Sequence, residues 1–311
     1  MTLRYIDLFC GIGGFRIAAE QVLERRGARG RCVFSCDIDP HARRAYEANF
    51  GETPAGDITA VSADVIPDHD ILFAGFPCQP FSIIGDMKGF EDTRGTLFFE
   101  IARVLEARKP RAFILENVKM LVGHRNGHTM RRIMQTLRDL GYFADYRVLN
   151  ALDFGLPQKR ERVVIVGFDR PMDFQWPQPK LSITPLSEIL EVDVDSKHFA
   201  SERIRRARLA SAMEQGTRDG DGPTIWHENK SGHVSVYPFS CALRAGASYN
   251  YLLVNGERRL TPREMLRLQG FPDTFKIVCN DWQTRRQAGN AVPPPVVAAV
   301  LESVFGGIRD W

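Results

Sequence analysis

The feature that most constrains the fold is an alternation of strand-like runs with helical segments over the first half of the chain. Strand-like runs lie at 5–9, 32–36, 71–74, 112–115, 142–150 and 163–167. Helical segments separate most of them, at 15–26, 41–50, 96–108 and 129–140. Continuous apolar runs between helices are typical of parallel strands that are covered on both faces. The pattern predicts an α/β fold with a doubly wound, mostly parallel sheet.

The alternation stops at a stretch that contains Pro171, Pro177, Pro179 and Pro185. Beyond it the chain shows short, irregular β-like runs separated by glycines. The apolar helix 296–305 must pack on a core, and the sheet of the first half offers the nearest unfinished one. We therefore expect one domain from 1–190 and 285–311, and a second, smaller mixed domain from 191–284.

Composition excludes several classes of protein. The 311 residues are 44% hydrophobic and 25% charged, which is ordinary for a globular protein. No run of eighteen apolar residues and no signal-peptide pattern occurs, so we expect a cytoplasmic protein without a membrane association. The six cysteines include no C-x-x-C pair and lie beside no histidine cluster, which argues against a disulfide framework and a metal site. The formal net charge is +3, and residues 191–286 hold fifteen Lys and Arg against twelve Asp and Glu, a weak hint of a phosphate-contacting face.

Two turns after the first two predicted strands carry residues typical of ligand binding. The first reads Cys-Gly-Ile-Gly-Gly at 10–14 and leads into a helix, so its backbone can approach a ligand at the helix's amino end. Such a turn fits NAD, a nucleoside cofactor such as S-adenosylmethionine, or close packing alone. Asp37 ends the second strand, where an acidic side chain commonly accepts hydrogen bonds from a ribose. The other interpretation of Asp37 is a helix cap, although Asp39 and Pro40 already open the next helix.

The turn at 75–82 reads Gly-Phe-Pro-Cys-Gln-Pro-Phe-Ser and follows a buried strand. It presents Cys78 at that strand's carboxyl end, where open α/β sheets keep their active sites. Pro77 and Pro80 fix the backbone around the cysteine, which suits a nucleophile that must be aimed. The alternative is a small, buried hydrophobic residue. The loop 85–95, rich in Gly, Asp and Lys, is predicted to act as a lid.

Charged side chains also stand at the ends of two later strands. Glu116 comes directly after an apolar strand, and a carboxylate there is costly to bury without a partner or a catalytic role. A structural salt bridge is the alternative. Lys159, Arg160 and Arg162 surround the entrance of the last apolar strand. They form either a solvated surface or, beside a thiol and a carboxylate, contacts to an oxyanion or a phosphate.

Seven motifs follow one another along most of the chain: DLFCGIGGF at 7–15, Asp37, GFPCQPFS at 75–82, ENV at 116–118, QKRER at 158–162, RRLTPREMLRLQGFP at 258–272 and GNAVPPPV at 289–296. In this order the sequence resembles the cytosine-5 DNA methyltransferases of the bacterial restriction–modification type. The resemblance implies a Rossmann-like, S-adenosylmethionine-dependent methyltransferase domain at 1–190 and 285–311. It also implies a target recognition domain and hinge at 191–284, with the recognition segment at 191–257.

The resemblance assigns a chemical role to each catalytic motif. Carbon 5 of cytosine is a poor nucleophile, and Cys78 is expected to activate it by adding a thiolate to carbon 6. Glu116 is expected to neutralise charge at ring nitrogen N3, and Arg162 to hold the cytosine carbonyl. Neighbouring residues that orient or support this group complete the predicted catalytic set: Asn117, Arg160 and Gln79.

The resemblance further implies S-adenosylmethionine as the methyl donor, S-adenosylhomocysteine as the product, and no metal. Asp37 is expected on the ribose. Many relatives carry glutamate at this position, so the shorter aspartate predicts a longer or water-mediated contact. The other predicted cofactor-binding residues are Phe9, Gly11, Gly13, Ile38, Asp57, Ile58, Pro77, Leu97, Asn290 and Val292.

Double-stranded DNA is the partner that the resemblance implies. Because carbon 5 is inaccessible inside a stacked duplex, the target base must be flipped out, and the loop 85–95 is expected to close over it. Ile84 and the pair Ser231 and Gly232 are the candidates to fill the gap in the duplex. We expect a monomeric enzyme in the bacterial cytoplasm, with a cognate restriction endonuclease as a genetic partner.

Three other functions fit parts of the sequence. A tRNA cytosine-5 methyltransferase of the same family is disfavoured, because the Pro-Pro-Cys turn and the Cys-Phe-Thr tripeptide of that branch are absent. A catalytically silent DNA-binding regulator on the same fold is disfavoured by the intact Cys78, Glu116 and Arg162. A Rossmann dehydrogenase would leave 75–82 and 258–296 without explanation.

Replacing Cys78 by serine is expected to abolish methyl transfer and to preserve DNA binding. The hydroxyl has almost the same shape as the thiol but is a much weaker nucleophile near neutral pH without an activating base. Transfer of a radiolabelled methyl group measures turnover, and a gel shift with duplex DNA measures binding. Retained turnover in the Cys78→Ser variant would overturn the assignment of the nucleophile.

Overall fold

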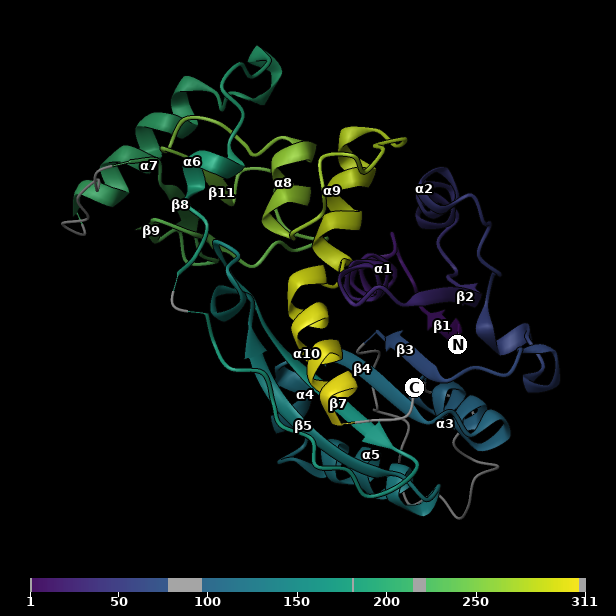
Figure 1. The fold of residues 1–311 in the computed structure, drawn as a ribbon. Coiled ribbons are helices and arrows are strands. Elements are labelled where there is room, and N and C mark those ends of the chain that lie inside the picture. The colour runs from purple at the N-terminus through teal and green to yellow at the C-terminus, as the bar shows by residue number, and fades with distance from the viewer. Residues whose placement is uncertain (1, 78–96, 181, 215–221, 308–311) are drawn as a thin grey trace. The chain divides into compact units, whose positions relative to one another are not determined.

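The computed structural model of the protein describes residues 2–77, 97–180, 182–214 and 222–307. The chain divides into two compact units, and Figure 1 follows its path through them. The first unit comprises Met1–Leu149, Glu161–Gln178 and Val296–Trp311; the second comprises Asn150–Arg160 and Pro179–Pro295. The predicted division into a methyltransferase domain at 1–190 and 285–311 and a recognition domain at 191–284 concerns function and remains a prediction.

A six-stranded sheet forms the centre of the first unit, in the order β2-β1-β3-β4-β7-β5. Its strands are β1 (Thr2–Leu8), β2 (Arg29–Cys36), β3 (Ile71–Gly75), β4 (Ala112–Val118), β5 (Phe143–Asn150) and β7 (Glu161–Phe168). β1 pairs in parallel with β2 and β3, and β3 pairs in parallel with β4. β7 runs antiparallel to β4. The prediction of an α/β fold with a mostly parallel sheet is confirmed.

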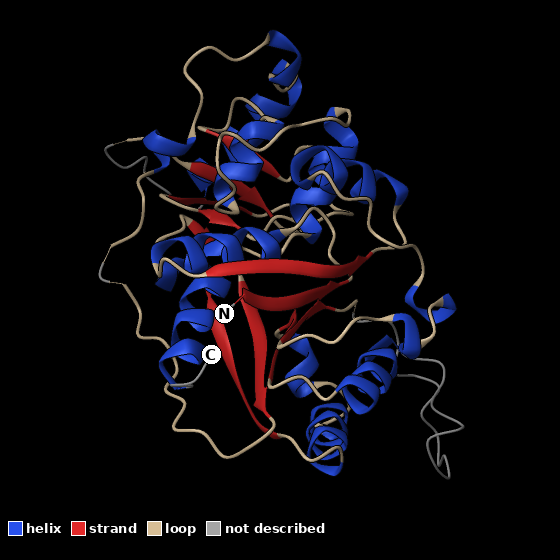
Figure 2. Ribbon diagram, turned by 45° about the vertical axis from the view of Figure 1, so that its right-hand side comes forward, coloured by secondary structure: helices blue, strands red, loops and turns tan. Residues whose placement is uncertain are grey.

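Helices cover both faces of this sheet, as the two views in Figures 1 and 2 show. They are α1 (Gly14–Arg25), α2 (Pro40–Phe50), α3 (Leu97–Arg108), α4 (Met120–Gly123), α5 (His128–Asp139) and the later α10 (Pro294–Gly307). Ile6 and Leu8 of β1 join a core that includes α3 and α5. Tyr5, on the opposite face of β1, packs against Phe73, whose ring stacks on Phe15 of α1 with centroids 5.4 Å apart. Because both faces are covered there, β1 is buried from Tyr5 to Leu8.

The second unit is a smaller mixed assembly of short elements. Its strands are β6 (Gln158–Lys159), β8 (Ile225–Glu228), β9 (Val234–Tyr237), β10 (Ser240–Cys241) and β11 (Leu252–Val254). β8 pairs antiparallel with β9 and β11, and β6 pairs with β10. Its helices are α6 (Leu186–Ile189), α7 (Glu202–Glu214), α8 (Pro262–Leu268) and α9 (Asp281–Asn290). A small core of Trp226, Val234 and Leu253 joins the sheet to α7.

The structure contains the helix caps that the sequence predicts for α2 and α8. Asp39 caps α2 by accepting a hydrogen bond from the His41 backbone N–H, with Pro40 in the first turn. Thr261 and Glu264 form the predicted capping box of α8. The fully buried Glu264 also pairs with Arg258 at 2.8 Å and accepts from the backbone N–H of Glu191 at 2.9 Å. This one carboxylate therefore ties residue 191 to the segment that begins at 258.

Among the described residues, one stretch passes a length and hydropathy test for a membrane span. It is Asp281–Gly307, which comprises α9 and α10. Of its most apolar window, 67% is buried inside the protein. Buried core helices pass the same test, so the stretch is weak evidence for a span.

Gly167 provides a test of how tightly β4 and β7 pack. It lies directly opposite Phe113, and a Cβ atom on Gly167 would stand 2.1 Å from the ring. Phe113 is fully buried and packs on Tyr142 at 5.1 Å, so the ring cannot easily move. We expect Gly167→Ala to lower the free energy of unfolding by about 1–3 kcal/mol.

The matched control is Gly306→Ala, because in the part of the chain that the structure describes no atom outside the surrounding backbone of α10 lies within 4 Å of the added methyl group. This change should be neutral or slightly stabilising. Urea denaturation followed by circular dichroism compares the two variants. Equal midpoints would show that the strand pair tolerates the extra atom.

Candidate active site

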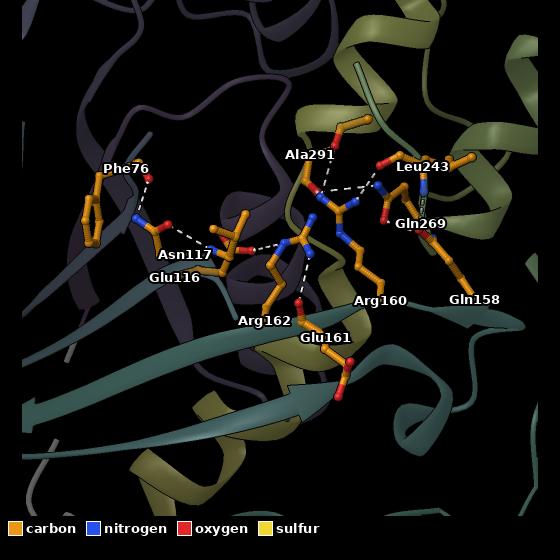
Figure 3. Close-up of polar contacts among 12 residues, drawn as sticks. Phe76, Glu116, Asn117, Gln158, Arg160, Glu161, Arg162, Leu243, Gln269 and Ala291 are labelled. Carbon is orange, nitrogen blue, oxygen red and sulfur yellow. Dashed lines mark hydrogen bonds and ion pairs between the residues drawn. The ribbon is translucent and has the colours of Figure 1, made fainter. Parts of the chain in front are cut away.

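The chain that leads into the predicted nucleophile is fastened to β4. Cys78 and Gln79 themselves lie outside the described residues, as do Ile84 and the predicted lid 85–95. Gly75, the last residue of β3, pairs with Glu116 of β4. The Asn117 side chain, 3% exposed, donates a hydrogen bond from Nδ2 to the Phe76 carbonyl at 2.9 Å. The sheet therefore holds the backbone up to two residues before Cys78 (Figure 3).

Glu116 and Arg162 form an ion pair at the end of β4. Arg162 Nε lies 3.0 Å from Glu116 Oε1, and the side chains are 12% and 17% exposed for Glu116 and Arg162 respectively. Arg162 also donates from Nη1 to the Glu161 carbonyl at 2.8 Å. Burial lowers the pKa of the Arg162 guanidinium below its ordinary value, and the charge of Glu116 offsets part of that effect. The structure thus brings together two of the residues that the sequence predicts for the site.

Arg160 has a different environment from Arg162. It is 2% exposed, and its guanidinium donates to the carbonyls of Leu243, Gly289 and Ala291, each at 3.0 Å. All of these partners belong to the second unit, as does Arg160. Gln158 also binds main chain, since its amide donates to the Leu268 carbonyl and accepts from the Leu243 backbone N–H. Of the QKRER motif, Gln158 and Arg160 therefore bind main chain of the second unit (Figure 3).

The glycine turn after β1 has a left-handed backbone that Asp37 holds in place. Phe9, Gly11 and Gly13 all have positive φ, at 55°, 54° and 88°. Asp37 accepts from the Gly11 backbone N–H through Oδ2 and from the Asp39 backbone N–H through Oδ1, both at 2.8 Å. One carboxylate therefore joins the turn after β1 to the turn before α2. Positive φ at the non-glycine Phe9 is costly, and such strain concentrates at functional sites.

The surroundings of this turn fit a nucleoside cofactor. Apart from its two chain neighbours, no atom of the described residues lies within 4 Å of the Cβ position of Gly11, so its backbone is open to close approach by a ligand. The Ile38 side chain, 70% exposed, offers apolar surface directly after Asp37. Burial raises the pKa of the Asp37 carboxyl above its ordinary value, against the opposing effect of its two N–H donors. A nucleoside cofactor requires apolar surface for its base, an acceptor near its ribose and a backbone that it can approach closely. The turn offers all three.

The other predicted cofactor residues occupy several elements. Asp57 is exposed and caps a short 3₁₀ helix, η1 (Ile58–Ala60), by accepting from the Thr59 backbone N–H at 2.9 Å, and Ile58 is buried. Pro77 is exposed, and Leu97 begins α3 half-buried. Asn290 is the exposed last residue of α9, and Val292 lies half-buried after it, both in the second unit. Their contacts to a cofactor remain predictions.

One buried group near the turn was missed by the sequence reasoning. Asp7 of β1 is fully buried, and neither of its carboxyl oxygens has a hydrogen-bond partner among the described residues. Burial raises the pKa of the Asp7 carboxyl well above its ordinary value, and the nearby Asp37 raises it further. A carboxylate inside an apolar strand was the signal that could have revealed it. Among the described residues, no group of three or more metal-ligating side chains occurs.

Comparisons with known proteins give one consistent result. The profile of the family described as C-5 cytosine-specific DNA methylase matches residues 3–306. Type II methyltransferase M.NgoBI from Neisseria gonorrhoeae is 55% identical over 296 residues, which cover 94% of this chain and 90% of the relative. Type II methyltransferase M.HaeII from Haemophilus aegyptius is 54% identical over 306 residues, covering 98% and 93%. The crystal structure of a Spodoptera frugiperda DNMT2 variant shares the fold, with a TM-score of 0.70 and 21% identity over 97% of this chain and 99% of that one.

Asp37→Asn is expected to weaken the binding of S-adenosylmethionine by about tenfold or more. The amide presents an NH₂ group toward one of the two backbone N–H donors, so one charge-assisted hydrogen bond, of about 1.5–3 kcal/mol, is lost from the turn. Isothermal titration calorimetry measures the affinity.

The control is Asp39→Asn, which makes the same change of charge two residues later. Asparagine is as good a helix cap as aspartate, so α2 and the affinity should be preserved. Equal affinities in the two variants would show that Asp37 does not hold the turn in its binding conformation.

Proposed function

The chain belongs to the C-5 cytosine-specific DNA methylase family, and we propose that it acts through a covalent adduct between Cys78 and the target cytosine. It is a DNA (cytosine-5)-methyltransferase of the restriction–modification type, dependent on S-adenosylmethionine. One observation supports the catalytic proposal above the others. The mostly buried pair joins Glu116 of β4 to Arg162 of β7, and β4 lies beside β3, the strand whose continuation carries Cys78.

Cys78 opens the reaction as a thiolate. Its sulfur bonds to carbon 6, and the electron pair of the 5,6 double bond makes carbon 5 nucleophilic. The cofactor supplies a methyl group on a sulfonium centre, which carbon 5 accepts. A base then removes the proton from carbon 5, the double bond re-forms, and the thiolate leaves carbon 6. Cys78 is regenerated unchanged.

Glu116 and Arg162 serve the ring while Cys78 is bonded to it. A proton shared between Glu116 and N3 neutralises the negative charge that thiolate addition places on the ring. Arg162 holds the cytosine carbonyl and, through its ion pair, fixes the orientation of the Glu116 carboxyl. Asn117 positions the Cys78 turn through its hydrogen bond to the Phe76 carbonyl. Gln79 is the second residue proposed to orient the catalytic side chains.

Arg160 is proposed as a positioning residue. Its guanidinium donates to three backbone carbonyls, an arrangement that supports main chain instead of contacting a base. Loss of Arg160 would remove a donor from each of these buried carbonyls, and an unsatisfied buried acceptor costs about 1–3 kcal/mol. The Ala291 carbonyl would keep a longer hydrogen bond from the Gln269 amide, at 3.5 Å. We assign to it the support of the second unit around Leu243 and Gly289.

The cofactor is proposed to lie over the glycine turn. Asp37 holds the turn and contacts the ribose, and Asp57 and Ile58 lie near the adenine. The remaining proposed contacts come from Phe9, Gly11, Gly13, Ile38, Pro77, Leu97, Asn290 and Val292.

The recognition segment at 191–257 is proposed to read the DNA sequence. Residues 191–257 form the target recognition segment, and the loop 85–95 closes over a flipped cytosine. Ile84 or the pair Ser231 and Gly232 fills the gap in the duplex. We propose a monomer that works in the bacterial cytoplasm alongside a cognate endonuclease. Bisulfite sequencing of DNA from cells that express the protein identifies the methylated cytosine and its sequence context.

The catalytic proposal predicts a covalent complex with DNA that contains 5-fluorocytosine, because fluorine cannot leave carbon 5 as a proton does. In the presence of S-adenosylmethionine, the wild-type protein should form an adduct that survives denaturation. Glu116→Gln should slow its formation by about 10²–10⁴-fold, since the amide cannot supply the proton at N3.

Glu106→Gln, an equal change at an exposed position of α3, should react at the wild-type rate. Denaturing gel electrophoresis over time measures all three proteins. An adduct at full rate in Glu116→Gln would remove Glu116 from the mechanism, and no adduct in the wild type would favour a catalytically silent regulator.

A further inference from the structure

A loop in the proposed recognition segment has a tip that is held through its backbone. The loop spans residues 242–251 between β10 and β11; Gly246 and Ser248 in the tip and Arg244 before it are exposed. The tip residues 245–248 are Ala-Gly-Ala-Ser, so side-chain packing contributes little to its shape. Its conformation must therefore come from contacts to its main chain.

Arginines from outside the loop supply those contacts. Arg160 donates to the Leu243 carbonyl at 3.0 Å, and Arg208 of α7 donates to the Asn250 carbonyl at 2.9 Å. Within the loop, the Tyr251 hydroxyl accepts from the Arg244 backbone N–H at 3.0 Å. Both ends of the loop are thus fixed, and the tip requires an anchoring contact of its own.

Arg285 of α9 provides this anchoring contact. It is 7% exposed, and its Nη2 donates to the carbonyls of Ala247 and Ser248 at 2.8 and 2.6 Å. Its guanidinium also lies over the ring of Tyr249 at 4.5 Å and over that of Tyr251 at 5.7 Å. One side chain therefore fixes two consecutive carbonyls of the tip and two aromatic rings at its base.

The same helix provides a close backbone contact one turn later. A Cβ atom at Gly289 would lie 2.4 Å from the backbone nitrogen of Ala245 and 2.8 Å from the carbonyl carbon of Arg244. Residues four apart lie on one face of a helix, so Arg285 and Gly289 form a single platform beneath the loop. Only glycine at 289 allows the loop backbone this near.

We propose that Arg285 is a positioning residue for sequence discrimination. The inference rests on the proposed recognition role of 191–257 and adds a residue outside that segment. Base readout requires polar groups to be held within about 0.5 Å of the productive geometry. A loop of small residues meets that requirement only when its carbonyls are fixed from elsewhere. Arg285 gives the tip this rigidity before DNA arrives, so the loop need not be ordered during binding.

The test compares Arg285→Ala with Arg286→Ala. Arg286 is the next residue of α9 and lies over the half-exposed Trp282 at 4.8 Å, so the two variants lose equal charge. Each is assayed with duplexes that carry the recognition sequence found by bisulfite sequencing and with duplexes that differ from it by one base pair. The measured quantity is the ratio of kcat/KM on the two kinds of duplex.

Arg285→Ala should reduce this ratio by about tenfold or more, through a raised KM on the correct duplex with kcat preserved. Arg286→Ala should leave the ratio unchanged. Arg285→Lys keeps a donor for the loop carbonyls and should recover part of the discrimination; it also decides the question if the alanine variant fails to fold. An unchanged ratio in a folded Arg285 variant, or an equal loss in Arg286→Ala, would overturn the proposal. Absence of methylation by the wild type would instead contradict the proposed function.

Discussion

The antiparallel pairing of β4 with β7 determines where the charges of the site lie. In its register Glu116 stands opposite Val164 and Val118 stands opposite Arg162, which brings the carboxylate and the guanidinium to one strand end. Both side chains are mostly withdrawn from water, and removing a charge from water is costly unless a partner compensates. Each charge is therefore stable only because the other is present. A shift of one residue in the register would turn these side chains to opposite faces of the sheet and leave both unpaired.

An interruption between two strands explains why two arginines separated by one residue have different partners. The strand interrupts at Arg160, between β6 and β7, so the usual alternation of side chains does not carry from Arg160 to Arg162. Arg162 meets a carboxylate and Arg160 meets three carbonyls. A guanidinium has five N–H groups in a fixed plane, so it can satisfy several separated backbone acceptors while remaining charged.

Much of the fold was predictable because its causes are local. Apolar runs specify the strands, and Asp39, Thr261 and Glu264 specify helix starts within a few residues of themselves. The direction of β7 was not predictable, since an apolar run has the same pattern in a parallel or an antiparallel strand. The partners of Arg160 and Arg285 were hidden for a related reason: a cation in a basic stretch has the same local pattern whether it is solvated or binds a carbonyl far along the chain. Such contacts depend on how distant segments fold against each other.

Anchoring the loop 242–251 by its carbonyls has a consequence for how this protein can diverge. Every residue has a carbonyl, so the hydrogen bonds from Arg160, Arg208 and Arg285 do not depend on which side chains the loop carries. Substitutions at the exposed positions 244, 246 and 248 can therefore accumulate without altering the path of the backbone. On the proposed recognition role of this segment, such exchanges can change the target sequence while the helix beneath the loop stays constant.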